Sequence, residues 1–170
     1  MANREIQEKV AVFPASFDPM TNGHLDIVER ALGIFDRLFL AVAYNIEKEG
    51  TFSKDERIAM LRSVFGDEPR IEVTAFDNLT VDFAMEIGAK VIIRGLRAMS
   101  DFEYEFEMAL MNKHLYPEVE TVFMMASHEY LYVSSSRLKE LVHLGRSVDA
   151  FVPEIVANKL HERLGRVKPA

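Results

Sequence analysis

The sequence contains no cysteine among its 170 residues. Disulfide bonds, zinc sites built from thiolates and redox reactions of a protein thiol are therefore excluded. The lack of cysteine fits a protein of a reducing compartment, and we expect a cytoplasmic location.

Long apolar runs are also missing. No stretch approaches the roughly 18 consecutive apolar residues that a membrane-spanning helix needs. Residues 1–10 are charged throughout and lack the apolar core of a signal peptide. We therefore expect a soluble protein that is not exported by a standard signal.

Positive charge is in short supply, because 20 basic residues face 27 acidic ones and the formal net charge is -7. Nonspecific binding to nucleic acid or to an anionic membrane is therefore disfavoured. With 49% hydrophobic and 28% charged residues, the composition excludes disorder and collagen. The length predicts one domain over residues 1–170, with frayed ends at residues 1–9 and 166–170.

Short apolar runs alternate with longer amphipathic segments along the chain. Most of the runs are rich in β-branched or bulky residues, as strands buried on both faces of a parallel sheet are. We expect five strands, at Val10–Phe13, Leu38–Ala43, Ile71–Thr74, Val91–Ile93 and Thr121–Met125.

The amphipathic segments predict helices at about Asn22–Ile34, from Ser53 onward, and at Leu79–Ile87, Ser100–His114, Ser135–His143 and Pro153–Leu164. Ser53 with Glu56 and Ser100 with Glu103 have the spacing of capping boxes. Residues 101–107 alternate in a way that also suits a strand, but the spacing of their apolar residues favours a helix. The order of elements predicts an α/β fold: a Rossmann-like doubly wound sheet of about five parallel strands with helices on both faces. Ligands of such sheets bind beyond the carboxyl ends of the strands.

The first strand leads into a loop that has the residues of a rigid turn at this crevice. It reads Phe13-Pro-Ala-Ser-Phe-Asp-Pro-Met-Thr-Asn-Gly-His24. His24 falls in the first turn of the next helix, where its ring and the free backbone N–H groups face one anion-binding space. The alternative is a packed histidine in a loop whose Asn22 caps the helix.

Three further segments have phosphate-binding chemistry. Arg94 and Arg97 flank Gly95 on an expected turn just past the fourth strand, and guanidinium groups match phosphate oxygens in pairs. Ser134–Ser136 open a helix and offer hydroxyls and N–H groups to a polyphosphate. Lys48 lies in the loop after the second strand, at the same edge of the sheet. The alternatives are a solvated basic turn, plain helix capping and a solvated lysine.

Thr21-Asn22-Gly23-His24 resembles the signature of the (H/T)xGH nucleotidylyltransferases, in its single-histidine form. Within that superfamily the chain is similar to the bacterial phosphopantetheine adenylyltransferases over nearly its whole length. The segments that fall in family order and spacing are Phe13–Pro19, Arg94-Gly-Leu-Arg97, Asp101-Phe-Glu-Tyr-Glu105, Met111-Asn112 and Ser134–Ser136. Ala15-Ser16 stands where that family usually has Gly-Thr, so the hydroxyl is kept.

The resemblance implies that the chain transfers AMP from ATP to 4'-phosphopantetheine, giving dephospho-CoA and pyrophosphate in coenzyme A biosynthesis. The attack is in line and has no covalent intermediate. His24, Lys48, Arg97 and Ser16 would be catalytic. The implied ATP site is Ser16, Phe17, His24, Gly95, Leu96, Arg97, Glu105, Tyr130, Leu131, Tyr132, Val133, Ser134, Ser135 and Ser136. The implied phosphopantetheine site is Ser16, Lys48, Thr80, Arg94 and Asn112.

The resemblance further implies Mg²⁺ that accompanies ATP without protein ligands, feedback inhibition by CoA, and a homohexamer. Two alternatives stay open at this point. One is a related nucleotidylyltransferase that acts on another phosphate, such as nicotinamide mononucleotide or glycerol phosphate. The other is a noncatalytic nucleotide-sensing module.

Overall fold

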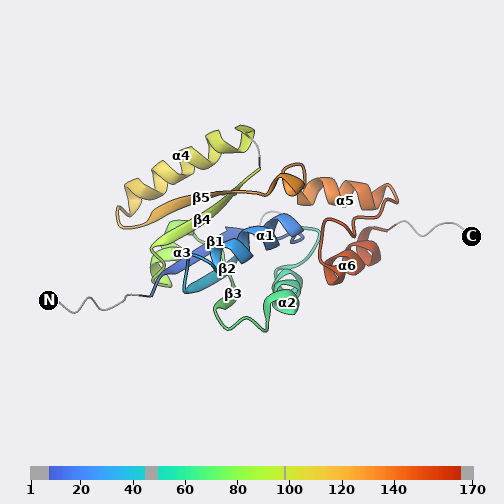
Figure 1. The fold of residues 1–170 in the computed structure, drawn as a ribbon, viewed down its shortest axis with the longest axis horizontal. Coiled ribbons are helices and arrows are strands. Elements are labelled where there is room, and N and C mark those ends of the chain that lie inside the picture. Colours follow the sequence, from blue (N-terminus) through green and yellow to red (C-terminus); the bar gives the residue numbers. More distant parts are fainter. Residues whose placement is uncertain (1–7, 45–49, 98, 166–170) are drawn as a thin grey trace, which may run out of the picture.

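A parallel sheet of five strands forms the centre of the molecule, in the order β3-β2-β1-β4-β5 (Figure 1). This computed structural model describes residues 8–44, 50–97 and 99–165. The strands are β1 (Val10–Ala15), β2 (Arg37–Ala43), β3 (Ile71–Phe76), β4 (Val91–Leu96) and β5 (Glu120–Met125). All five predicted strands are confirmed, and each is slightly longer than its apolar run.

Helices alternate with the strands as the sequence predicts. They are α1 (Asn22–Ala31), α2 (Lys54–Phe65), α3 (Thr80–Glu86), α4 (Met99–Leu115), α5 (Ser135–His143) and α6 (Glu154–Leu164), with a 3₁₀ turn η1 (His128–Tyr130). The ambiguous residues 101–107 are helical. Helix α1 ends before the predicted Ile34, because Gly33 follows and disfavours helix continuation.

One of the two predicted capping boxes forms. Ser53 donates its backbone N–H to Glu56 Oε2 at 2.8 Å, and Glu56 returns a bond to Ser53 Oγ at 3.2 Å. The box predicted at Ser100 is wrong, because α4 begins at Met99 and Ser100 lies inside the helix. Methionine is a better helix former than serine, so the helix extends past the residue expected to cap it.

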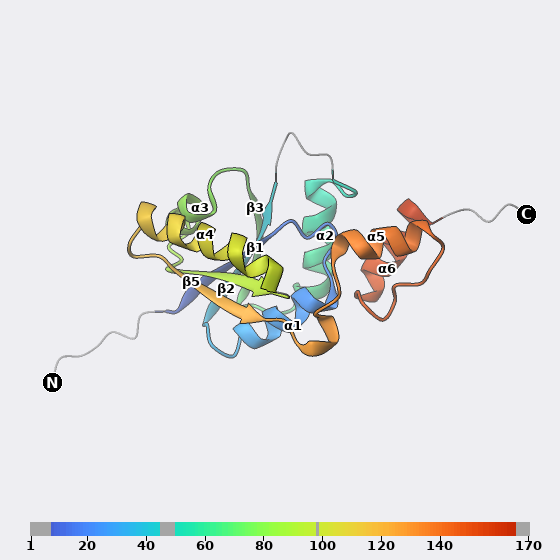
Figure 2. The same cartoon turned by 90° about the horizontal axis from the view of Figure 1, so that it is seen from above.

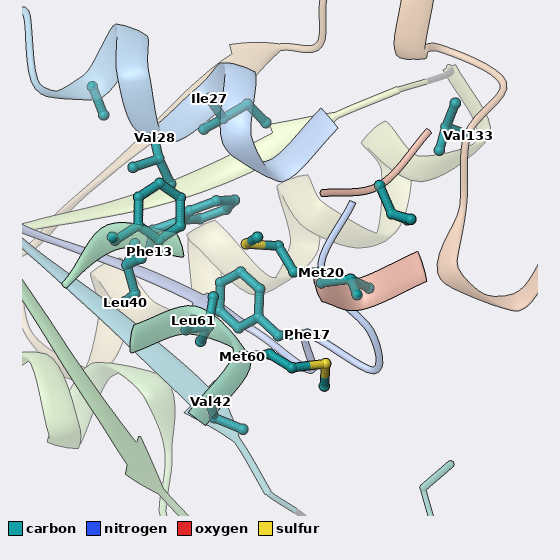
Figure 3. Packing of buried hydrophobic residues seen from close by; sticks show 14 of the residues in the cluster. Phe13, Phe17, Met20, Ile27, Val28, Leu40, Val42, Met60, Leu61 and Val133 are labelled. Atoms are coloured by element: carbon teal, nitrogen blue, oxygen red, sulfur yellow. The ribbon is translucent and has the colours of Figure 1, made fainter. Parts of the chain in front are cut away.

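Helices cover both faces of the sheet, which confirms the doubly wound prediction. Alternate strand residues such as Phe13, Leu40 and Val42 pack on one face against α1 and α2 (Figure 3). Val12 and Ile92 point to the other face, where α3 packs. Helix α4 lies on that second face over β5, with the rings of Phe102 and Phe123 5.9 Å apart.

The two central strands part before they end. β1 pairs with β4 only through Ala11 with Val91 and Val12 with Ile92. β1 stays paired with β2 as far as Ala15, and β4 stays paired with β5 as far as Leu96. A crevice therefore opens between the carboxyl halves of β1 and β4, where the strand order reverses and ligands of such folds bind.

Beyond these strand ends, the buried carboxylate of Asp18 joins three segments. Its two oxygens accept the backbone N–H groups of Thr51 and Phe52, each at 2.9 Å. Lys139 on α5 donates to Oδ2 at 2.9 Å, and Arg57 on α2 lies 3.4 Å from Oδ1. Burial alone would raise the pKa of Asp18, but the bonds from Thr51, Lys139 and Phe52 outweigh it and hold the pKa below 3.8.

The sequence predicts frayed ends at residues 1–9 and 166–170. Residues 1–7 and 166–170 lie outside the described residues. Lys9 is held, because its backbone N–H donates to Asp36 Oδ2 at 2.8 Å. Among the helices that the structure describes, none has the length and apolar character to span a bilayer.

We predict that Asp18→Asn lowers the free energy of unfolding at pH 7 by about 2–4 kcal/mol, because a buried charge network loses its centre. The pKa of Asp18 is depressed on folding, so its contribution is present above pH 4 and is lost as the pH falls through the folded-state pKa. The stability gap should therefore shrink below pH 4. Urea unfolding at several pH values measures it, with exposed Asp67→Asn as the control. A gap that is no larger for Asp18→Asn than for Asp67→Asn would contradict the prediction.

Candidate active site

A cavity of about 410 Å³ opens at the carboxyl ends of β1 and β4. It brings together most of the predicted site residues: Ser16, His24, Arg94, Gly95, Arg97, Glu105, Tyr130, Val133, Ser134, Ser135 and Ser136. Segments that lie more than a hundred residues apart in the sequence thus form one site.

Other predicted residues do not line this cavity. Phe17 and Leu96 are buried in the protein, while Leu131 and Tyr132 are exposed. The two residues expected to line the pantetheine arm lie elsewhere: Thr80 begins α3, and Asn112 is buried on α4. Lys48 lies outside the described residues.

Seven residues line the cavity without having been predicted as binding residues: Phe13, Pro14, Ala15, Thr21, Gly23, Ile27 and Ala126. Thr21 and Gly23 belong to the Thr21–His24 motif, and Ala126 directly follows β5. The sequence could therefore have identified these three as cavity-lining residues. Nothing in the sequence around Ile27 separates it from the other apolar residues of α1.

His24 is held at the start of α1 by a reciprocal cap. Thr21, not Asn22, is the N-cap residue; its backbone N–H donates to His24 Nδ1 at 3.0 Å, and the His24 N–H points back to Thr21 Oγ1 at 3.4 Å. Because Nδ1 accepts a backbone N–H, the proton of the neutral ring is on Nε2. The ring lines the cavity, so Nε2–H is the donor it offers to a ligand.

The surroundings of His24 keep the ring uncharged. Desolvation by burial, together with the positive charge of Arg97, lowers the pKa of His24 from 6.5 to about 4. The ring of Phe17 lies 5.1 Å away and that of Phe13 lies 6.1 Å away. Phe17 has a φ of 47°, a left-handed conformation that bulky residues seldom adopt. His24 is thus a neutral hydrogen-bond donor at neutral pH.

Gly23 of the motif packs closely against Tyr130. A Cβ added at Gly23 would lie 3.3 Å from the Cβ of Tyr130, which is tighter than ordinary contact. Tyr130 sits on η1 and forms a wall of the cavity. The glycine therefore lets this aromatic wall approach the start of α1.

Arg94 lies inside β4, not on the turn that the sequence suggested, because Arg94 is still paired with Phe123 of β5. Its Nε and Nη2 each donate to a carboxylate oxygen of Glu105 at 2.6 Å, and Nη1 donates to the Pro14 carbonyl at 2.9 Å. The bond to Pro14 spans the gap between β1 and β4. A guanidinium has five N–H groups, and these contacts within the described residues engage three of them.

Arg97 directly follows β4 and also lines the cavity. Its Nη1 donates to the Val133 carbonyl at 3.3 Å, next to the start of α5. Arg94 and Arg97 thus both line the cavity, Arg94 from inside the strand and Arg97 from just after its end.

The first turn of α5 faces the cavity through Ser134–Ser136. Ser134 is the N-cap and accepts the N–H of Arg137 at 3.3 Å, while Ser135 donates its hydroxyl to the Pro19 carbonyl at 2.8 Å. The capping role is thus confirmed for Ser134. The backbone N–H groups of the first turn still make this end of the helix suited to a negatively charged ligand.

Within the described ranges, no group of three His, Asp or Glu side chains is placed to hold a metal ion. The cavity itself gathers a set of donors: His24 Nε2, the guanidinium of Arg97 and the start of α5. Such a set is suited to binding a polyphosphate and to stabilising charge at one of its phosphorus atoms.

Comparisons with known proteins agree with this chemistry. The model of the Cytidylyltransferase-like family matches residues 12–141. Phosphopantetheine adenylyltransferase of Desulforamulus reducens is 50% identical over 92% of this chain and 98% of its own. The enzyme of the same name from Geotalea daltonii is 51% identical over 93% of this chain and 98% of its own.

Solved structures share the fold at low sequence identity. A putative nicotinate-nucleotide adenylyltransferase from Vibrio parahaemolyticus has a TM-score of 0.66 and 17% identity, over 91% of this chain and 99% of the other. Plasmodium falciparum nicotinic acid mononucleotide adenylyltransferase, complexed with NaAD, also has a TM-score of 0.66, at 10% identity over 92% and 96% of the two chains. With a family model that spans most of the chain and relatives about half identical to it, this chain belongs to the Cytidylyltransferase-like family.

Proposed function

We propose that this chain transfers AMP from ATP to 4'-phosphopantetheine, releasing pyrophosphate and dephospho-CoA. The main structural support is the cavity, which is lined by His24, Arg94, Arg97 and the start of α5. The names of relatives about 50% identical over nearly the whole chain support this acceptor. The two solved adenylyltransferase structures support the fold. Their sequence identity to this chain is too low to support a shared acceptor substrate.

The reaction needs alignment more than proton transfer. A phosphate oxygen of the acceptor is already ionised at neutral pH, attacks the α-phosphorus of ATP and displaces pyrophosphate. Two polyanions must be held in line, and charge that develops on the α-phosphate must be stabilised. A neutral His24 that donates from Nε2 meets the second need without requiring a proton transfer.

The cavity suggests a division of labour between its two ends. Arg97 and the first turn of α5 lie together and would hold the β- and γ-phosphates. Arg94, inside β4, and Ser16, just after β1, line the cavity and would hold the acceptor phosphate. Glu105 orients Arg94 through two bonds of 2.6 Å, and Tyr130 supplies the aromatic wall of the nucleotide site.

The proposal also includes binding roles that rest on the resemblance alone. They belong to the ATP-site residues Phe17, Leu96, Leu131 and Tyr132 and to the phosphopantetheine-site residues Lys48, Thr80 and Asn112. Mg²⁺ would enter with ATP as a bound part of the substrate, because magnesium prefers phosphate oxygens and water to an all-protein site. CoA would inhibit, because it contains the phosphopantetheine arm and an adenylate that match both halves of the product.

A homohexamer is proposed on the same resemblance, and the surface of α4 supports self-association. Exposed apolar side chains follow this helix, among them Phe106 at 45%, Leu110 at 57% and Met111 at 55% exposure. Apolar area of this kind usually marks an interface. The absence of cysteine supports a cytoplasmic location.

Release of pyrophosphate from ATP, measured with 4'-phosphopantetheine, nicotinamide mononucleotide and glycerol phosphate, tests the function. The proposal is supported if 4'-phosphopantetheine is the one acceptor of the three that gives release. Release with another acceptor alone would favour a related transferase, and ATP binding without release would favour the sensing module.

We predict that His24→Ala lowers kcat by about 10²–10³, because one donor to the developing charge is lost. The dissociation constant for ATP should change only a few-fold. Exposed His143→Ala is the matched control and should keep normal turnover. Near-normal kcat in His24→Ala would refute the assigned role.

A second prediction concerns the pH dependence of turnover. Between pH 7 and 9, kcat/KM should show no inflection from an enzyme base, because the attacking oxygen is already ionised and the pKa of His24 is about 4. An NMR titration of the His24 ring should accordingly have its midpoint near pH 4. A rate inflection that keeps its pH when the acceptor is changed would contradict the prediction.

The two arginines should separate kinetically. Lysine keeps the charge but loses the planar fork, so Arg94→Lys should raise KM mainly for phosphopantetheine. Arg97→Lys should raise KM for ATP and lower kcat. Steady-state kinetics with each substrate varied in turn measures both effects. Equal weakening of both substrates by both variants would instead indicate one shared anion patch.

A further inference from the structure

Helix α5 presents the start of its first turn to the cavity, yet its body lies away from the sheet. Figures 1 and 2 both place α5 beside α6, beyond the carboxyl ends of the strands. Its buried residues Leu138 and Val142 pack in the same apolar cluster as Val156 and Leu160 of α6. The same cluster contains Phe17 and Met20 of the loop between β1 and α1, so apolar packing and polar contacts together set the position of Ser134–Ser136 relative to His24.

Two side-chain hydrogen bonds join α5 to this loop. Ser135 donates its hydroxyl to the Pro19 carbonyl at 2.8 Å. Lys139 donates Nζ to Asp18 Oδ2 at 2.9 Å. Residues four apart on a helix lie on the same side, so both bonds fasten one side of α5 to adjacent residues of the loop.

The ion pair of Lys139 is anchored more firmly than a surface pair. The Asp18 side chain is 10% exposed and that of Lys139 is 26% exposed. Asp18 is itself fixed by the N–H groups of Thr51 and Phe52, and Arg57 lies 3.4 Å away. An ammonium bound to a fixed, poorly hydrated carboxylate has little freedom to move. Neither Lys139 nor Asp18 is among the residues that line the cavity.

From this geometry we propose that Lys139 is a positioning residue for the triphosphate of ATP. Through its ion pair with Asp18, it holds the first turn of α5 at the distance from His24 that the phosphates require. This inference rests on the proposed function for the identity of its ligand. Lys139 lies outside the cavity, yet it determines the affinity for ATP and leaves the affinity for phosphopantetheine unchanged.

The test compares Lys139→Met, which keeps the length of the side chain and removes the ammonium, with Lys139→Arg, which restores a cation. Arg146→Met removes an exposed cation just after α5 and is the matched control. We expect Lys139→Met to weaken ATP binding by about tenfold in calorimetry and to raise KM for ATP equally, since small misplacements of binding groups are costly. KM for phosphopantetheine should stay within about twofold, and Lys139→Arg should recover most of the ATP affinity.

A general loss of structure would give a different result. If Lys139→Met lowers the melting temperature but leaves ATP binding equal to that of Arg146→Met, or weakens both substrates equally, the proposal is overturned. Coupling through Asp18 is checked by combining Lys139→Met with Asp18→Asn. The effects on the ATP dissociation constant should be clearly less than additive, and full additivity would also overturn the proposal.

ATP binding is measured without turnover, so the inference can fail separately from the proposed function. If the unsubstituted protein releases no pyrophosphate with phosphopantetheine, the proposed function fails while the comparison of ATP affinities still decides the role of Lys139. If Lys139→Met does not fold, Lys139→Gln provides the same comparison, with the same selective loss of ATP affinity expected.

Discussion

Backbone pairing between β1 and β4 stops at Val12 and Ile92, and the cavity occupies the space that this leaves. Pro14 fits the interruption because it has no N–H to donate to a neighbouring strand. The carbonyl of Pro14 is satisfied by Arg94, whose side chain reaches across from β4. The same arginine thus bridges the two strands where their backbone pairing ends, and it lines the cavity.

A second constraint acts beyond the strand ends, where the elements around the cavity are joined by buried polar contacts. Asp18 binds the backbone of Thr51 and Phe52 and the side chain of Lys139. A buried carboxylate without partners would be costly, so these contacts stabilise the folded loop. These contacts therefore position three elements together: the loop that carries Ser16, the start of α2, and helix α5, whose first turn lines the cavity.

His24 shows how the packing of this site sets its chemistry. An exposed histidine would be partly protonated near neutral pH, but burial and the charge of Arg97 lower the pKa of His24 to about 4. The bond from the Thr21 N–H to Nδ1 then determines which nitrogen keeps its proton. The position and tautomer of the ring follow from contacts within Thr21–His24, and its uncharged state follows from burial and from Arg97.

The order of strands and helices was readable from the sequence, because buried parallel strands are short apolar runs and helices repeat every 3.6 residues. The residues around His24, Arg94, Arg97 and Ser134–Ser136 were readable because each carries local phosphate-binding chemistry. Tertiary structure alone decided that β4 continues through Arg94, since pairing with β5 extends the strand past its apolar run. It also decided that Glu105 pairs with Arg94 and Lys139 with Asp18. Those partners lie 11 and 121 residues apart, and no sequence period relates residues that only the folded chain brings together.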